Sequence, residues 1–471
     1  MKTTARRIAR CFPVFFTSKR KRTRRIVALF FTLLFLGIYF VLAQFEQTGL
    51  IGLKMSNTRT FASENSFSWD SVLDALEHTE EGDFLRYDKG KTKGKQTHDK
   101  LKVIVLLHSH NDPGYKYTYD QYYFNKTKHV LSLAVEKLMK YQDMTFIWTD
   151  TCFLDRIWKE LSDEMKANLK YLVKTGRFEI SLGAWVSADE CVTHYYSYID
   201  QLIEGYSWIR QHFDVFPNVS FNMDQFGTSS SIHYIRRKVG IRHSVYNHIH
   251  KGTKVFFRKN RLLEFNLKQS LINNMDSFVH VEPFDDLGFK GSCGPSAKIC
   301  SKLALTKTTL SFDKSLPRNA TSMDFAEQLV SQIRLKSEMY LHNVLFLPVG
   351  DDLVYITSQE WDNQYKNLKK LMQYINDKSK WKIDIQFGTL SQYFRELEKV
   401  ASKSVKQFPT VSGDLFPYTR GPKYWSGYFT TRQFVKRLGR ELQESVRATE
   451  MLIAFTIPNT IERIQPISNK V

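Results

Sequence analysis

The sequence predicts an α/β fold with a mainly parallel sheet, a (β/α) barrel or a variant of one. Short apolar runs typical of buried strands recur along most of the chain, and segments with a helical period lie between them. Because a crossover helix is the usual connection between parallel strands, this alternation is the pattern of a parallel sheet. With 471 residues, of which 42% are apolar, the chain is long enough to bury a large core.

The first segment of the chain is strongly basic. Residues 1–25 carry ten Lys and Arg and no acid, against a net charge of +20 for the whole chain. Since half of the net charge lies there, the basic composition does not indicate a nucleic-acid partner. The segment is predicted to be a cytosolic tail.

An uncharged apolar run follows at residues 26–43, near the lower limit of length for crossing a bilayer. It is longer than the apolar core of most signal peptides and lacks an evident cleavage site, so it predicts an uncleaved signal anchor. The basic flank then sets a type II orientation, with all later residues in a lumen. A cleaved signal peptide is the alternative, and it would leave the chain in the same compartment.

Polar, lysine-rich residues 44–100 are predicted to form a stem, with one amphipathic helix at residues 69–76. The α/β domain is predicted at residues 101–405. Its strands are predicted at residues 102–107, 144–149, 178–182, 219–223, 243–246, 344–348 and 383–386. Its helices are predicted at residues 122–141, 153–175, 195–213, 230–239, 323–341 and 359–377.

Sequons and cysteines agree with a lumenal compartment. Three N-glycosylation sequons start at Asn125, Asn218 and Asn319. Cys293 and Cys300 enclose a short Gly-Pro turn and are predicted to form a disulfide. Two further cysteines of the predicted domain are buried thiols or a second bridge; they are Cys152 and Cys191.

Chemically active side chains follow several predicted strands. His110 and Asp112 come after the strand at 102–107, Asp224 ends the strand at 219–223, and the pair Asp351-Asp352 follows the strand at 344–348. The carboxyl ends of parallel strands are where barrels keep their catalytic residues. An imidazole and a carboxylate two residues apart can share a divalent metal, although a polar strand end is the alternative for any single position.

Several longer stretches carry a family resemblance. They are HSHNDPGY (108–115), GAWVSADE (183–190), DQFGTS (224–229), CGPSAKIC (293–300), PVGDD (348–352), QFGTLSQYF (386–394), FPTVSGDLFPYT (408–419) and YWSGYFTTR (424–432). From about residue 101 to 455 the chain resembles the class II α-mannosidases of glycoside hydrolase family 38. The anchor and stem resemble the Golgi branch of that family.

The resemblance implies a zinc-dependent retaining glycosidase with Zn²⁺ as its cofactor. Residues that match the family's zinc ligands are His110, Asp112 and Asp224. Asp224 also matches the nucleophile and Asp352 the general acid/base, and a retaining mechanism requires two such carboxyls close together. Positions matching the rest of the sugar site are Tyr115, Phe226 and Asp351.

The chain also departs from the family pattern. Gln225 and Thr228 replace residues usual after the nucleophile, His248 stands where a substrate-binding arginine is usual, and Leu287-Gly288 replaces a Tyr-Asp pair. Residues 406–471 resemble only the start of a helical middle domain and end in a divergent tail without the segment that holds the fourth zinc ligand. We therefore expect weak zinc binding and little or no turnover by this chain alone.

The predicted function is that of a retaining α-mannosidase-like hydrolase of N-glycan processing, acting on N-linked oligosaccharides at the Golgi membrane. The alternative is a catalytically impaired homologue that binds glycans or regulates a full-length partner, as a homodimer or in a mixed pair. A different zinc hydrolase, such as a deacetylase, would leave the YWSGY and CGP stretches unexplained.

Overall fold

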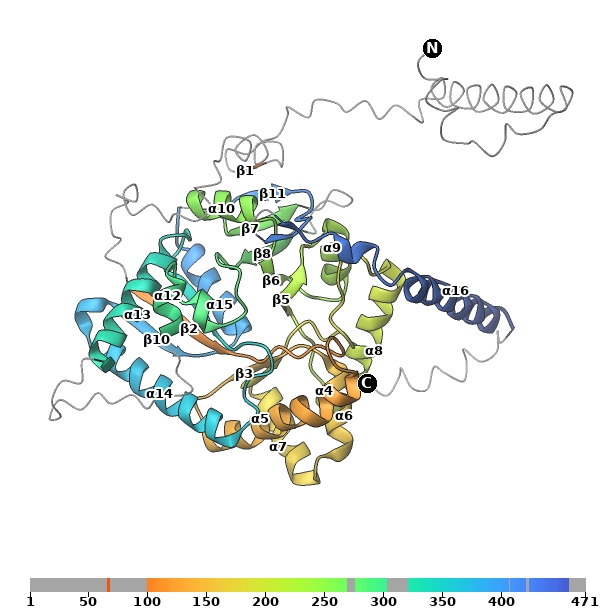
Figure 1. Ribbon diagram of the computed structural model, residues 1–471, viewed down its shortest axis with the longest axis horizontal. Coiled ribbons are helices and arrows are strands. Elements are labelled where there is room, and N and C mark those ends of the chain that lie inside the picture. The colour runs from red at the N-terminus through yellow and green to blue at the C-terminus, as the bar shows by residue number, and fades with distance from the viewer. Residues whose placement is uncertain are drawn as a thin grey trace, which may run out of the picture. The chain divides into compact units, whose positions relative to one another are not determined.

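The computed structural model describes residues 66–67, 100–268, 276–302, 321–405, 407–420 and 423–456 (Figure 1). The predicted basic tail, the anchor at 26–43, the helix at 69–76 and the sequon at Asn319 lie outside the described residues. Within the described ranges, no helix combines the length and the apolar character needed to cross a membrane.

Every strand predicted from the apolar runs is present. These strands are β2 (Leu101–Leu107), β3 (Phe146–Trp148), β4 (Phe178–Ile180), β5 (Val219–Phe226), β6 (His243–His248), β9 (Val344–Val349) and β10 (Ile383–Phe387). Strands that the sequence analysis missed are β1 (Ser66–Phe67), β7 (Glu264–Lys268), β8 (Ser277–Val281), β11 (Thr410–Ser412), β12 (Thr419–Arg420) and β13 (Lys423–Tyr424). Their short, polar-interrupted sequences lack the continuous apolar run that marked the others.

The prediction of a mixed α/β fold with mainly parallel strands is confirmed. The described strands pair in the orders β1-β11-β7-β8-β6-β5, β10-β2-β9, β12-β13 and β3-β4. Only β7–β8 and β12–β13 are antiparallel among these pairs. Two isolated β-bridges follow the end of β2: His108 pairs with Ile147, and His110 pairs with Asp352.

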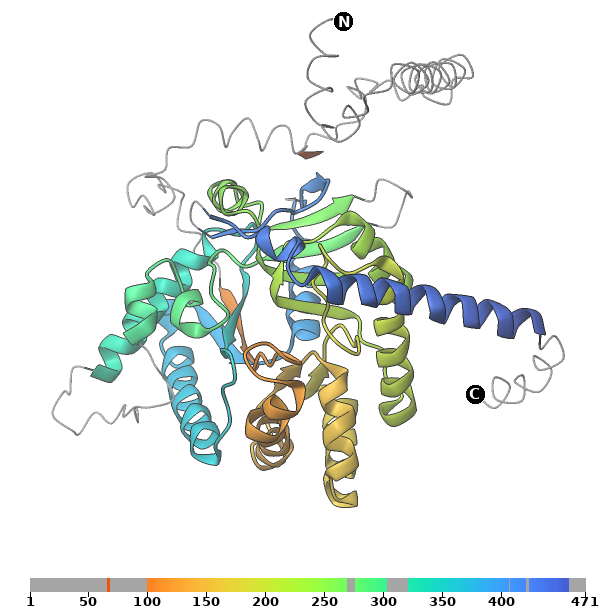
Figure 2. The same ribbon diagram turned by 45° about the vertical axis from the view of Figure 1, so that its right-hand side comes forward.

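Helices surround the strands (Figures 1 and 2). Those at predicted positions are α5 (Lys128–Lys140), α6 (Thr151–Glu160), α7 (Asp163–Lys174), α8 (Tyr195–Phe213), α9 (Ser230–Lys238), α13 (Thr321–Ser337) and α14 (Ser358–Asn376). Those not predicted are α4 (Tyr119–Tyr122), α10 (Lys251–Asn260), α11 (Phe289–Ser292), α12 (Ala297–Lys302), α15 (Leu390–Ala401) and α16 (Gln433–Thr456). The single helix predicted at 153–175 was wrong, because Ser162 starts a second helix by accepting a hydrogen bond from Met165 N–H.

Strand β2 shows why the apolar runs are continuous. Val103 and Val105 point into one core cluster, whereas Ile104 and Leu106 point into another. All four side chains are buried. A parallel strand covered on both faces needs apolar residues at consecutive positions, so β2 could be recognised from sequence without alternation.

The predicted disulfide is confirmed. The sulfur atoms of Cys293 and Cys300 are 1.98 Å apart, and the Cα atoms are separated by 5.7 Å. The open alternative for the other two cysteines is also decided: Cys152 and Cys191 are free thiols, the first of them buried. The bridge joins Cys300, within α12, to Cys293, the residue that follows α11.

Candidate active site

The carboxyl ends of β2, β5 and β9 bring the predicted catalytic residues together. His110 follows β2, and its backbone N–H donates to Asp351 O at 3.1 Å while its carbonyl accepts from Leu353 N–H at 2.9 Å. This bridge sets His110 opposite Asp352, which follows β9. Asp224 lies near the carboxyl end of β5, two residues before the strand ends. The parallel pairing of β2 with β9 therefore brings His110 next to Asp352, and Asp224 joins them from β5, a strand of a separate sheet.

Three of these side chains form a compact ligand group. One ligand atom each from His110, Asp112 and Asp224 lies within 4.8 Å of the others. The Nε2 atom of His110 is 3.0 Å from Asp112 Oδ1 and 3.4 Å from Asp224 Oδ2. Imidazole nitrogen and carboxylate oxygen are ligands that Zn²⁺ accepts, so the residues present fit a zinc ion.

Charge in the cluster favours ionised carboxylates. Burial disfavours the imidazolium, but hydrogen bonds to Asp112 and Asp224 outweigh burial and raise the pKa of His110 well above its usual value. Burial would favour protonated Asp224, yet His110 and His248 together hold the pKa of this carboxyl well below its usual range. Asp224 is thus charged at neutral pH, as both a nucleophile and a metal ligand must be.

The second carboxyl pair has a different environment. Partial burial, followed by the nearby carboxylates of Asp224 and Asp112, raises the pKa of Asp352, against the opposing effect of His110. A raised pKa is what a general acid needs, because it must hold its proton until the leaving group takes it. Asp351 is held instead by Lys290 Nζ at 3.2 Å and accepts from Asp352 N–H at 2.9 Å.

His248 contacts the predicted nucleophile directly. Its Nε2 atom lies 3.2 Å from Asp224 Oδ1, whereas His110 approaches the other oxygen, Oδ2. The Asp224 carboxylate is therefore held on both sides. His248, which stands where the family usually has an arginine, therefore contacts the predicted nucleophile Asp224.

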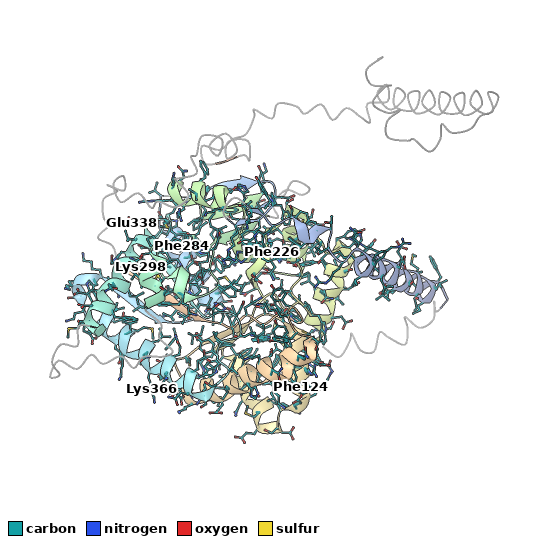
Figure 3. All side chains as sticks on the ribbon, viewed as in Figure 1. Phe124, Phe226, Phe284, Lys298, Glu338 and Lys366 are labelled. Carbon is teal, nitrogen blue, oxygen red and sulfur yellow. A yellow bond between two sulfur atoms is a disulfide. The ribbon has the colours of Figure 1, made fainter. Side chains whose placement is uncertain are left out.

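Phe226 and Tyr115, the two predicted sugar-lining aromatics, have different surroundings. Phe226 packs against Tyr418, Trp425 and Tyr428, with ring centroids 5.1–5.6 Å apart. Figure 3 shows Phe226 well inside the outline of the molecule, whereas the exposed Phe124 lies at its edge. Tyr115 is 71% exposed on the loop after Asp112. Phe226 thus belongs to a packed aromatic cluster, whereas the Tyr115 ring is largely exposed and has Lys116 Nζ over it, 5.5 Å from the ring centroid.

A buried ion pair supports β5 and the turn that follows it. Arg236 Nη2 donates to Glu190 Oε1 at 2.7 Å, and both side chains are almost fully buried. The same nitrogen donates to Asn222 Oδ1 at 3.1 Å, and Glu190 Oε2 accepts from Ser229 N–H at 3.4 Å. Further hydroxyl partners of the guanidinium are Tyr198 and Tyr246. Asn222 and Ser229 flank Asp224 in sequence, so the pair fixes the strand on both sides of it.

Two further acids were missed by the sequence analysis. Asp150 follows β3, accepts from Ser187 N–H at 2.7 Å, and has its pKa raised to about 6 by burial. Asp189 has its pKa raised to about 6 by burial and then by the charges of Asp224 and Asp112. Asp150 shares the signal that located the other acids, a carboxylate at a strand end, and could have been found by it.

The Leu287-Gly288 departure has a steric explanation. A Cβ atom on Gly288 would lie 2.2 Å from the carbonyl oxygen of Gly350, the residue before Asp351. His108 donates from Nε2 to the carbonyl of Leu287 at 2.8 Å. The backbone therefore approaches the end of β9 more closely than any side chain at position 288 would allow.

Comparisons with known proteins agree with this geometry. The family described as Glycosyl hydrolases family 38 N-terminal domain matches residues 100–421. Alpha-mannosidase 2 of Drosophila melanogaster is 36% identical over 392 residues, which cover 81% of this chain and 35% of that protein. Alpha-mannosidase 2 of Homo sapiens is 36% identical over 373 residues, covering 76% of this chain and 32% of that protein.

A plant relative is similar to the same extent. Alpha-mannosidase 2 of Arabidopsis thaliana is 34% identical over 383 residues, covering 76% of this chain and 33% of that protein. The chain thus spans about a third of the length of the curated relatives it matches. With a family match over most of its described residues and a site built from the matched motifs, this chain belongs to glycoside hydrolase family 38.

Proposed function

We propose that this protein is a zinc-dependent retaining α-mannosidase. The observation that carries the proposal is the meeting of four side chains at the carboxyl ends of three strands: ligand atoms of His110, Asp112 and Asp224 lie within 4.8 Å of one another, and Asp352 lies opposite His110. Asp224 is held ionised within the ligand group, and Asp352, opposite His110, is held towards its protonated form. Glycoside hydrolysis requires one carboxyl that is ionised and one that holds a proton, and we take the retaining outcome from the family resemblance.

The residues divide the reaction between them. Asp224 attacks the anomeric carbon while Asp352 gives its proton to the leaving oxygen, so that a glycosyl ester forms on Asp224. Asp352 then takes a proton from water, which attacks the same carbon and releases the sugar with its original configuration. Zn²⁺ held by His110, Asp112 and Asp224 would supply a Lewis-acid contact to sugar hydroxyls. His248 and His110 keep the Asp224 carboxylate oriented throughout.

Zinc content and hydrolysis together test the proposal. We expect the purified chain to bind one Zn²⁺ through His110, Asp112 and Asp224, and to hydrolyse an aryl α-mannoside slowly. Chelation should remove both the metal and the activity, and added Zn²⁺ should restore both. His110→Ala should lower zinc affinity about 10- to 100-fold or more, measured by competition with a chromophoric chelator. Hydrolysis at an unchanged rate by the zinc-free chain would contradict the proposal.

We further propose N-linked oligosaccharides in the Golgi lumen as the substrate, with the chain anchored by residues 26–43 in the type II orientation. Asn125 and Asn218 are exposed, as acceptors of lumenal glycans must be. We expect the chain expressed in a secretory-competent cell to lose mass on treatment with an N-glycan-releasing enzyme. Asn218→Gln should remove one glycan from the total. A chain without glycan at any of its three sequons would argue against the lumenal orientation.

A further inference from the structure

A group of buried ionisable side chains lies in the core, among β7, β8, α13 and α15 (Figure 1). Its members are Glu264, His280, Glu282 and Lys336, and each of them is at most 1% exposed. The chemistry proposed above uses none of these side chains. We refer to the four residues as the core charge cluster.

The two carboxylates of the cluster lie on opposite sides of His280. The Nδ1 atom of its ring is 3.1 Å from Glu264 Oε1, and the Nε2 atom is 3.5 Å from Glu282 Oε1. Glu264 and His280 are direct partners in the antiparallel pairing of β7 with β8. A neutral imidazole carries one N–H, whereas an imidazolium carries an N–H on each nitrogen. The position of the two carboxylates therefore favours the protonated ring.

The balance of charge in the cluster favours the same state. Lys336 Nζ donates to Glu282 Oε2 at 2.8 Å and to the carbonyl of Phe346 in β9 at 3.4 Å. The cluster thus contains two carboxylates and one lysine. When His280 is protonated, the formal charges sum to zero. When His280 is neutral, one buried carboxylate is left without a counter-charge, which is costly in a core.

The other side chains that face His280 carry no charge near neutral pH. Tyr340 OH lies 3.2 Å from the Nε2 atom of His280, and Tyr393 OH, from α15, lies 3.1 Å from the Nδ1 atom. Burial raises the pKa of both phenols well above the usual value, so both stay neutral. β9 contributes the ring of Phe346, with ring centroids 4.6 Å apart, and β6 places Val245 opposite His280.

The contacts of His280 set the sign of its effect on stability. Burial by itself lowers the pKa of the ring, but the hydrogen bonds and charges of Glu264 and Glu282 outweigh burial and raise this pKa. The unfolded chain has the ordinary pKa of about 6.5. Protonated His280 therefore stabilises the folded state fully below about pH 6.5, and this contribution is lost as the pH rises through the raised pKa.

The other charged groups of the cluster titrate from ordinary values further from neutrality. Burial would raise the pKa of Glu282, but Lys336 and His280 outweigh burial and lower it. The stability that Glu282 contributes is thus lost only as the pH falls through this lowered pKa. Burial lowers the pKa of Lys336, from an ordinary value of about 10.4. His280 is therefore the member of the cluster whose ordinary pKa lies nearest to neutrality.

We propose that the core charge cluster is a pH-sensitive device: the proton on His280 holds β7, β8, α13 and α15 together, and its loss above neutrality loosens the domain. The proposal goes beyond the proposed function and does not depend on it. Its consequence is a catalytic domain that is more stable at mildly acidic pH than at mildly alkaline pH.

Urea unfolding of the full chain, followed by circular dichroism between about pH 6.5 and pH 8.5, tests the device. His280 should make the unfolding constant of the parent rise with pH by up to about tenfold per pH unit, the limit for one proton. Glu264→Gln removes one carboxylate, so a neutral His280 no longer leaves an unpaired charge. We expect this variant to have a shallower slope, with a difference from the parent that narrows as the pH rises.

A double variant, Glu264→Gln with His280→Gln, leaves the balanced pair Glu282–Lys336 and should show the same shallow slope. It supplies the slope if Glu264→Gln alone fails to fold. His129→Gln is the matched control and should keep the slope of the parent, because His129 is exposed on α5. A double variant with the slope of the parent would overturn the proposal. A loss of stability in Glu264→Gln that is the same at every pH would also overturn it, since it would show a hydrogen bond without a linked proton.

Discussion

Replacing Asp224 by asparagine should remove all measurable hydrolysis of an aryl α-mannoside. We expect kcat/KM to fall by at least about 10³-fold, because the amide cannot form the glycosyl ester and loses the charge held between His110 and His248. Because the pKa of Asp224 is well below its usual range, we expect the size of this loss not to change with pH near neutrality. Initial rates at several substrate concentrations give kcat/KM for the parent chain and for the variant.

A trapping experiment identifies the residue without relying on turnover. A fluorinated mannosyl fluoride, which forms the glycosyl ester faster than water can hydrolyse it, should label Asp224 in the parent chain and nothing in Asp224→Asn. Asp163→Asn, at the exposed start of α7, is the matched control and should keep both the activity and the label. Robust hydrolysis by Asp224→Asn, or a label on another carboxylate, would refute the assignment of the nucleophile.

Glu190→Gln should destabilise the protein by about 3–5 kcal/mol, because it leaves the buried Arg236 guanidinium without its counter-charge. The measurement is the free energy of unfolding from urea titration followed by circular dichroism. Two neutral replacements together, Glu190→Gln with Arg236→Met, should recover part of the loss, since no uncompensated charge then remains.

The exposed pair Arg437–Glu441 gives the control. Its atoms are 2.8 Å apart but both side chains are more than half exposed, so Glu441→Gln should cost less than about 1 kcal/mol. A loss of similar size at the two positions would show that the buried pair does not carry the stability assigned to it. Lower activity in Glu190→Gln with intact folding would show that the pair also positions Asp224.

The sequence was informative where a signal is local. Continuous apolar runs located β2 and β9, since strands covered on both faces need consecutive apolar residues. Acids at the ends of such strands indicated Asp224 and Asp352, and the carboxyl ends of β5 and β9 both lie next to His110. The spacing of Cys293 and Cys300 around a turn was enough to predict their bridge.

Other features depend on contacts between segments that are distant in the chain. Arg236 lies in the last turn of a helix, where an exposed basic residue is common, and nothing nearby in sequence marks its burial against Glu190. The hydrogen bond of His248 to Asp224 depends on the pairing of β5 with β6, whose register shifts between Asn222 and Phe226, around Asp224. Burial, charge partners and register arise only when strands and helices pack, and these set the acidity of the carboxyls on which the proposed chemistry rests.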